Sequence, residues 1–196
     1  MAHARLGIAE ENSGKLVTLI RKEGRKLAEE KVLKLSQVDG LTNMANRRHF
    51  DNFLNDEWNR CLRLNMPITL AIIDIDNFKT LNDTYGHQTG DDYLKRIAAI
   101  LKNFAKRPSD ICARYGGDEF VLLLGNTDCE TSEVIINKLF NAIRELKIPN
   151  INVLSTQNFT VSIGVATMYP DKKTTHEDLI KAADTLLYRA KELDKN

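Results

Sequence analysis

The stretch 113–123 reads Ala-Arg-Tyr-Gly-Gly-Asp-Glu-Phe-Val-Leu-Leu, and it decides the fold of this chain. Apolar, strand-forming residues flank Gly116-Gly117, a pair that favours a tight hairpin turn because glycine reaches positive φ without a Cβ clash. Two carboxylates, Asp118 and Glu119, follow the glycines directly. Bare backbone beside paired acids suits a metal-bound polyphosphate, since acids hold hard cations through oxygen. An ordinary exposed turn with two surface acids is the alternative.

A second pair of acids lies upstream of this hairpin. Residues 68–73 form a continuous apolar run, typical of a strand that is buried on both faces. The run ends in Asp74-Ile75-Asp76, and strand alternation places Asp74 and Asp76 on the same face. A solvated strand end would explain this pair alone, whereas two acid pairs together indicate a metal site.

The elements around these two strands predict the fold class. Helices are expected at about 46–64, 130–146 and 176–193, and another carries apolar residues from Leu94 to Phe104. The segment 77–91 is rich in turn formers, with 89–91 as the cap of the next helix, and residues 159–166 alternate as a strand. This order predicts an α+β, ferredoxin-like or palm-like βαββαβ domain, with a central antiparallel sheet flanked by helices. In that topology Asp74 meets Asp118-Glu119 at one edge of the sheet.

Composition limits the class of protein and its compartment. The chain has 196 residues, which suits one domain, and a net charge of +1, which argues against a nucleic-acid surface. Its three cysteines lack metal-ligand spacing, and no apolar run is long enough to span a membrane, so a cytoplasmic location is expected. Residues 1–24 are read as a tail or linker remnant, 25–38 as a lead-in signalling helix, and 39–196 as the main domain.

Converging acids predict chemistry on phosphates. Two-metal sites hold divalent ions roughly 3.5–4 Å apart and assist in-line phosphoryl displacement. Magnesium fits best, with manganese as a substitute, because every candidate ligand is an oxygen. Lys79 and Lys191 are candidates for neutralising a triphosphate, although a solvated surface charge is the alternative for each. Asp91 can accept from guanine N1–H and the exocyclic amine, and Asn82 can complement the neighbouring acceptor, so the pair predicts selection of guanine over adenine.

At this point the chain from Asp39 to Asn196 resembles the GGDEF-domain diguanylate cyclases, which join two GTP molecules into cyclic di-GMP. The signature Gly116-Gly117-Asp118-Glu119-Phe120 is intact. Further matches occur in order along the chain: Asp39-Gly40-Leu41-Thr42, Asn46-Arg47, Asp74 to Lys79, Asn82-Asp83, Gly86-His87, Gly90-Asp91, Ser162-Ile163-Gly164, Ala183-Asp184, Tyr188 and Lys191.

The resemblance implies a role for each matching residue. The magnesium ligands would be Asp74, the Ile75 carbonyl, Asp118 and Glu119, with Asp118 and Glu119 also catalytic. The substrate-binding set would comprise Phe78, Lys79, Asn82, His87, Asp91, Leu94, Lys191 and Lys195. The family usually has arginine where this chain has Lys195, which keeps the charge but loses the bidentate fork and is expected to weaken GTP binding.

Regulation and assembly are implied in the same way. Arg107 and Asp110 match an R-x-x-D pattern that forms an inhibitory site for the product in many family members. Each domain supplies one GTP half-site, so catalysis requires a homodimer. The partners expected are therefore GTP, cyclic di-GMP and a second copy, without nucleic acid, and the chain resembles the cytoplasmic part of a larger sensor.

Two other functions are compatible with parts of this pattern. A catalytically silent relative would bind GTP or cyclic di-GMP as a receptor, although such proteins usually show damage in the signature or the metal aspartate. A mononucleotide cyclase or polymerase-like enzyme would lack the guanine readers Asn82 and Asp91, and a polymerase would need a basic template groove.

Overall fold

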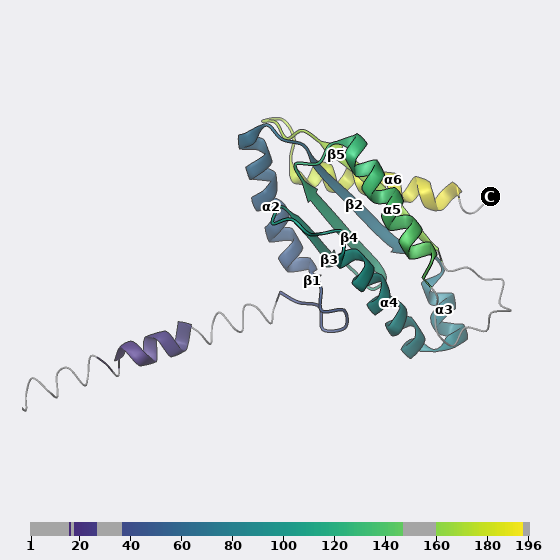
Figure 1. Ribbon diagram of the computed structural model, residues 1–196, viewed down its shortest axis with the longest axis horizontal. Helices are drawn as coiled ribbons and strands as arrows, with labels where there is room; N and C mark the ends of the chain where they lie inside the picture. Colours follow the sequence, from purple (N-terminus) through teal and green to yellow (C-terminus); the bar gives the residue numbers. More distant parts are fainter. Residues whose placement is uncertain (1–15, 17, 27–36, 147–159, 194–196) are drawn as a thin grey trace, which may run out of the picture. The chain divides into compact units, whose positions relative to one another are not determined.

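The computed structural model describes residues 16, 18–26, 37–146 and 160–193 (Figure 1). The chain divides into two units, Met1–Val38 and Asp39–Asn196. In the first unit residues 18–26 are helical, and Gly24 lies within this helix. A single glycine costs an exposed helix only about 1 kcal/mol, which this helix tolerates. The lead-in helix predicted at 25–38 lies largely outside the described residues and stays a prediction.

The second unit is built on a five-stranded sheet in the order β1-β3-β4-β2-β5. The strands are β1 Ala45–Asn46, β2 Ile68–Ile75, β3 Asp110–Arg114, β4 Glu119–Gly125 and β5 Val161–Met168. Strand β2 pairs antiparallel with both β4 and β5, and β3 pairs antiparallel with β4. The predicted ferredoxin-like arrangement is therefore confirmed. The short β1 was not predicted, and because it runs parallel to β3 the sheet is mixed rather than wholly antiparallel.

Helices cover both faces of the sheet (Figure 1). They are α2 Arg47–Leu64, α3 Phe78–Tyr85, α4 His87–Lys102, α5 Cys129–Arg144 and α6 His176–Leu193. One core cluster joins α4 and α5 to the odd-numbered residues of β2, such as Ala71 and Ile73. The other joins α2 and α6 to the even-numbered residues Leu70 and Ile72. Strand β2 is thus buried along its whole length, which explains its continuous apolar sequence.

Two helices replace the turns that were predicted at 77–91. Helix α3 occupies 78–85, and α4 begins at His87 directly after Gly86, whose φ of 84° lies in the left-handed region. Burial explains α3, because Leu81 is 0% exposed and fixes this polar segment to the core. Asp91 lies inside α4, so its predicted role as the N-cap residue was wrong.

The other helix boundaries follow local rules that the sequence displays. The Asn46 side chain accepts a hydrogen bond from the His49 amide at 3.1 Å and so caps the start of α2. Asn65 ends this helix in the left-handed conformation, and Pro67 follows two residues later. Helix α6 has the predicted bounds. Within the described residues, no helix is long and apolar enough to cross a membrane.

Candidate active site

The two predicted acid pairs meet on neighbouring strands. Asp74, near the end of β2, lies directly opposite Glu119, the first residue of β4. The Ile75 amide donates to the Asp118 carbonyl at 3.4 Å, so the chain carrying Asp118 also lies beside the end of β2. Residues directly opposite in an antiparallel pair project from the same face, and like charges there repel. The predicted convergence of Asp74 with Asp118-Glu119 is confirmed, although it lies where two inner strands end rather than at an outer edge of the sheet.

A lysine from the last helix neutralises part of this acid cluster. The Lys191 Nζ lies 2.7 Å from Asp74 Oδ1. Asp74 continues the even-numbered face of β2, which α6 covers, so a residue near the end of α6 can reach it. A close helix–strand contact sets this position: a Cβ built on Gly164 would lie 2.2 Å from the Ala183 carbonyl oxygen and 2.3 Å from the Leu187 nitrogen. Glycine at this point in β5 therefore lets α6 lie directly on the sheet.

Electrostatics in the cluster favour binding of a cation. Burial raises the pKa of Asp74, as do Asp118 and Asp76, while Lys191 acts in the opposite direction. Burial also raises the pKa of Glu119, reinforced by Asp74 and Asp118. Carboxylates that repel one another in a partly desolvated site gain stability when a positive ion arrives.

The donor set fits magnesium in company with a phosphate ligand. Among the described residues, no three His, Cys, Asp or Glu side chains are grouped closely enough to enclose a metal ion. Magnesium is usually held by one or two carboxylates together with substrate phosphates and water, rather than by a protein cage. The Asp74–Glu119 pair, with the Asp118 carboxylate and the Ile75 carbonyl nearby, matches that incomplete, all-oxygen set.

The glycine turn differs from the prediction. Neither Gly116 nor Gly117 has φ in the left-handed region. Four residues connect β3 to β4, and the Tyr115 and Gly116 amides both donate to the Glu119 carbonyl, at 2.8 and 3.2 Å. This longer turn does not require positive φ. The Glu119 carboxylate lies in the space beside Gly116: a Cβ there would lie 2.7 Å from Glu119 Oε2, so a larger residue would displace that carboxylate.

Arg114, the last residue of β3, stabilises this turn through contacts with Gly117 and Asp39. Arg114 donates from Nη2 to the Gly117 carbonyl at 2.7 Å, and its Nη1 lies 3.3 Å from Asp39 Oδ2. Asp39 also accepts from the Thr42 amide and hydroxyl, at 2.9 and 2.7 Å. The pairing of Asp39 with Arg114 was not predicted, since these residues are 75 positions apart in the chain. The start of the domain is thereby tied to the acid-bearing turn.

Asp76 has a bracing role that the sequence did not indicate. Its two carboxylate oxygens accept from the Thr160 hydroxyl at 2.7 Å and the Ser162 hydroxyl at 2.6 Å. Because both oxygens already have close donors, Asp76 fastens the end of β2 to β5. Asp74 has no such hydroxyl partner among the described residues and contacts Lys191 instead.

The predicted nucleotide-binding residues lie on α3 and α4, which follow β2. Phe78, Lys79 and Asn82 are on α3, and His87, Asp91 and Leu94 are on α4. Lys79, His87 and Asp91 are exposed, whereas Leu94 is 1% exposed and belongs to the core. Lys195 lies outside the described residues.

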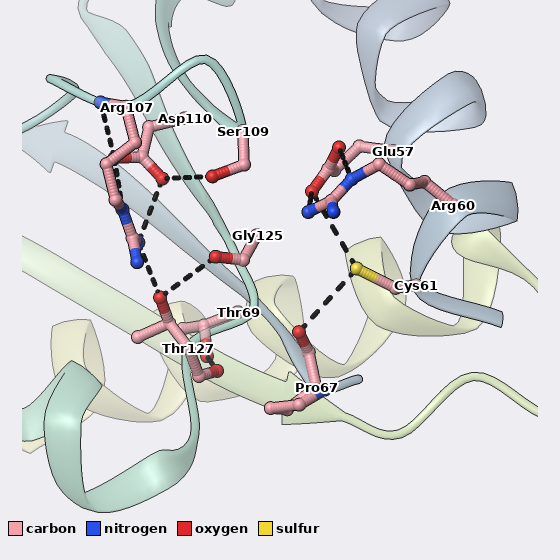
Figure 2. Close-up of polar contacts among 10 residues, drawn as sticks. All are labelled: Glu57, Arg60, Cys61, Pro67, Thr69, Arg107, Ser109, Asp110, Gly125 and Thr127. Atoms are coloured by element: carbon pink, nitrogen blue, oxygen red, sulfur yellow. Dashed lines mark hydrogen bonds and ion pairs between the residues drawn. The ribbon is translucent and has the colours of Figure 1, made fainter. Parts of the chain in front are cut away.

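The predicted inhibitory pair forms a well-ordered unit at the other end of β4 (Figure 2). Arg107 Nη2 lies 2.9 Å from Asp110 Oδ1, its Nε donates to Oδ2 at 3.0 Å, and its Nη2 also donates to the Thr127 hydroxyl at 2.7 Å. The guanidinium is therefore held in a fixed orientation while 46% of the side chain stays exposed. It borders a cavity of about 430 Å³ that is lined by Glu57, Arg60, Met66, Arg107, Pro108, Ser109 and Asn126.

A second ion pair borders this cavity and was not foreseen. Arg60 donates from Nε to Glu57 Oε2 at 2.7 Å, and the Glu57 side chain is buried. The two residues are three apart on α2, a spacing that permits such a pair but does not predict its burial. Two arginines, Arg60 and Arg107, thus border one cavity, each held by its own carboxylate (Figure 2).

Fold and acid cluster together define a palm-like α+β domain with a carboxylate site where two neighbouring strands meet. The family model described as "Diguanylate cyclase, GGDEF domain" matches residues 36–196, and the chain belongs to the GGDEF family.

Known relatives agree with this assignment. The chain is 36% identical over 173 residues to the "Probable diguanylate cyclase DgcC" of Escherichia coli K12, covering 87% of this chain and 45% of that protein. It is 34% identical over 172 residues to "Diguanylate cyclase DgcM" of the same strain, covering 88% and 40%. The chain thus spans less than half the length of these curated relatives. The crystal structure of the coiled coil and GGDEF domain of DgcB from Caulobacter crescentus, in complex with c-di-GMP, matches with a TM-score of 0.79 at 30% identity, covering 89% and 91%.

Proposed function

We propose that this chain is a diguanylate cyclase that condenses two GTP molecules into cyclic di-GMP and two pyrophosphates. The observation that carries the proposal is the pairing of Asp74 with Glu119 beside the Asp118 turn, with Lys191 at 2.7 Å from Asp74. Residues 39–196 would form the cyclase domain and 25–38 a signalling helix. GTP as the substrate places the reaction in the cytoplasm.

In this proposal the residues of the acid cluster bind the metal ions and accept a proton. Asp74, the Ile75 carbonyl, Asp118 and Glu119 would hold two Mg²⁺ ions, which when bound stabilise the charge that develops on the phosphate oxygens. Asp118 would accept the proton of the attacking 3′-hydroxyl. The 3′-oxygen then bonds to the α-phosphorus of the other GTP, the bond from that phosphorus to the α–β bridging oxygen breaks, and pyrophosphate leaves. A second such step closes the ring, which requires two chains face to face.

Binding of GTP would use the helices that follow β2. Asn82 and Asp91 would read the guanine base above the core that includes Leu94. Phe78, Lys79 and His87 would border the nucleotide, and Lys191 and Lys195 would bind its phosphates. The exposed positions of Lys79, His87 and Asp91 support access by a ligand.

Product analysis tests the proposal directly. Incubated with GTP and Mg²⁺ at concentrations high enough to dimerise, the chain is expected to form cyclic di-GMP, measured by chromatography. Asp118→Ala should form none, while Asp56→Ala, which alters an exposed acid on α2, should match the wild type. If the intact chain forms no cyclic dinucleotide yet binds GTP or cyclic di-GMP, it is a silent receptor rather than a cyclase.

We also propose that the product inhibits the enzyme at Arg107 and Asp110. Asp110 fixes the Arg107 guanidinium at the cavity, where it would donate to a phosphate or a guanine edge. Arg107→Ala is expected to weaken cyclic di-GMP binding about 10-fold or more, measured by calorimetry, because a charge-assisted hydrogen bond contributes about 1.5–3 kcal/mol. Lys106→Ala removes a neighbouring exposed charge and serves as the control. Equal affinities of the wild type and Arg107→Ala would remove this part of the proposal.

A further inference from the structure

Gly90 lies where the two nucleotide-binding helices touch. A Cβ built on it would lie 2.0 Å from Asn82 Oδ1, 3.0 Å from Asn82 Cγ and 3.2 Å from Phe78 Cζ. Asn82 and Phe78 are four residues apart on α3, so they share the face that meets α4. The Asn82 carboxamide therefore occupies the space that any side chain at position 90 would need.

The backbone at position 90 gives no other reason for glycine. Gly90 is the fourth residue of α4 and its φ lies outside the left-handed region, so an ordinary residue can adopt its conformation. Alanine within a helix is favoured over glycine by about 1 kcal/mol. Glycine at position 90 makes α4 less stable than alanine would. We therefore attribute its presence to the space that the missing Cβ leaves.

No hydrogen bond orients the Asn82 carboxamide in the described part of the protein. Its Oδ1 atom is buried and has no hydrogen-bond partner among the described residues, although the residue as a whole is half-buried. Buried polar atoms without partners are uncommon and call for a specific explanation. The side chain lies in the space that Gly90 leaves open.

From this contact, and resting on the function proposed above, we infer that Gly90 is a positioning residue for guanine recognition. Because position 90 has no side chain, the Asn82 carboxamide can lie between α3 and α4, next to Asp91. The Asn82 and Asp91 side chains then present their polar groups together. A methyl group at position 90 would contact only the ends of the Asn82 and Phe78 side chains, and it would displace the Asn82 carboxamide from this position. At Gly164, in contrast, a Cβ would meet the backbone of α6.

A double-mutant cycle with Gly90→Ala and Asn82→Ala tests the inference on the full chain. The readout is the ratio of the dissociation constants for ATP and GTP, measured by calorimetry with Ca²⁺ to prevent turnover. Each single variant is expected to lower this ratio about 10-fold, the effect of losing one hydrogen bond of roughly 1.4 kcal/mol. The double variant should be no worse than either single one, because both remove the same contact. Gly40→Ala is the matched control, since nothing lies within 4 Å of a Cβ there.

The outcomes separate the inference from the function on which it rests. If Asn82→Ala lowers the ratio and Gly90→Ala does not, or if the two effects add in the double variant, the inference is wrong while guanine reading by Asn82 stands. If Asn82→Ala has no effect, the proposed guanine site itself fails. Thermal unfolding gives a readout independent of nucleotide: Gly90→Ala should raise the Tm in the Asn82→Ala background, where its methyl group has room. A double variant that is less stable than Asn82→Ala would overturn the inference, even if Gly90→Ala alone fails to fold.

Discussion

Asp74→Asn is expected to lower the rate of cyclic di-GMP formation on the order of 10³-fold, the scale observed when electrostatic stabilisation of a transition state is lost. Asparagine has almost the same shape but no charge, so it removes the proposed cation ligand and the partner of Lys191 without leaving a cavity. Initial rates with saturating GTP and Mg²⁺ measure the effect. Asp56→Asn, on the exposed face of α2, controls for the loss of one negative charge.

The same substitution should leave the fold at least as stable. Because the pKa of Asp74 is raised in the folded protein, the folded state binds its proton more tightly than the unfolded state does. The free energy of unfolding therefore falls as the pH rises from 3.8, the ordinary pKa of an aspartate, through the raised folded pKa. At neutral pH the charged form carries the full cost of burial. Asparagine avoids this cost.

Thermal unfolding with and without Mg²⁺ distinguishes a lost ligand from a damaged fold. Mg²⁺ that binds only the folded state should raise the Tm of the wild type at pH 7. This increase should be much smaller for Asp74→Asn. It should also shrink for the wild type as the pH falls below the raised pKa values of Asp74 and Glu119, because protonated carboxyls bind Mg²⁺ poorly. A Tm increase of equal size in the variant would show that Asp74 does not hold the ion.

The sequence predicted the parts of this molecule that are set by hydrophobic pattern. The run 68–73 was recognisable as a central strand because helices cover both of its faces, and α6 because its apolar residues repeat at helical spacing. Joining these elements in ferredoxin-like order was enough to place Asp74 beside Glu119. The order of the strands alone therefore predicted the Asp74–Glu119 pair at the centre of the candidate site.

What the sequence did not predict depends on tertiary contacts between distant residues. Helix α3 has only Leu81 fully buried, so its pattern resembled a series of turns. The Asp39–Arg114 and Asp76–Ser162 contacts join residues far apart in the chain, and a single sequence contains no pairing signal for them. The expected left-handed glycines at 116–117 were wrong for a related reason: hydrogen bonds to Glu119 and Arg114 shape that turn.

Lys191→Met is expected to reduce kcat/KM for GTP about 100-fold and to change its dependence on pH. Lys191 lies against Asp74 and opposes the rise in the pKa values of Asp74 and Glu119. Removing its charge should raise both pKa values further, and protonated carboxyls bind Mg²⁺ poorly. The acidic limb of the kcat/KM profile should therefore move to higher pH. Loss of a phosphate contact accounts for the rest of the effect.

The pH profile separates this role from a simple phosphate contact. If Lys191 only binds phosphate, kcat/KM falls equally at every pH and the limb stays in place. Lys191→Arg keeps the positive charge and should restore the position of the limb, even if the longer guanidinium does not reproduce the phosphate contact of the lysine. Lys181→Met, at an exposed position on the same helix, should match the wild type. Lys191 would thus favour the ionised form of Asp74 and Glu119, which would hold Mg²⁺, and would also donate to the phosphates of GTP.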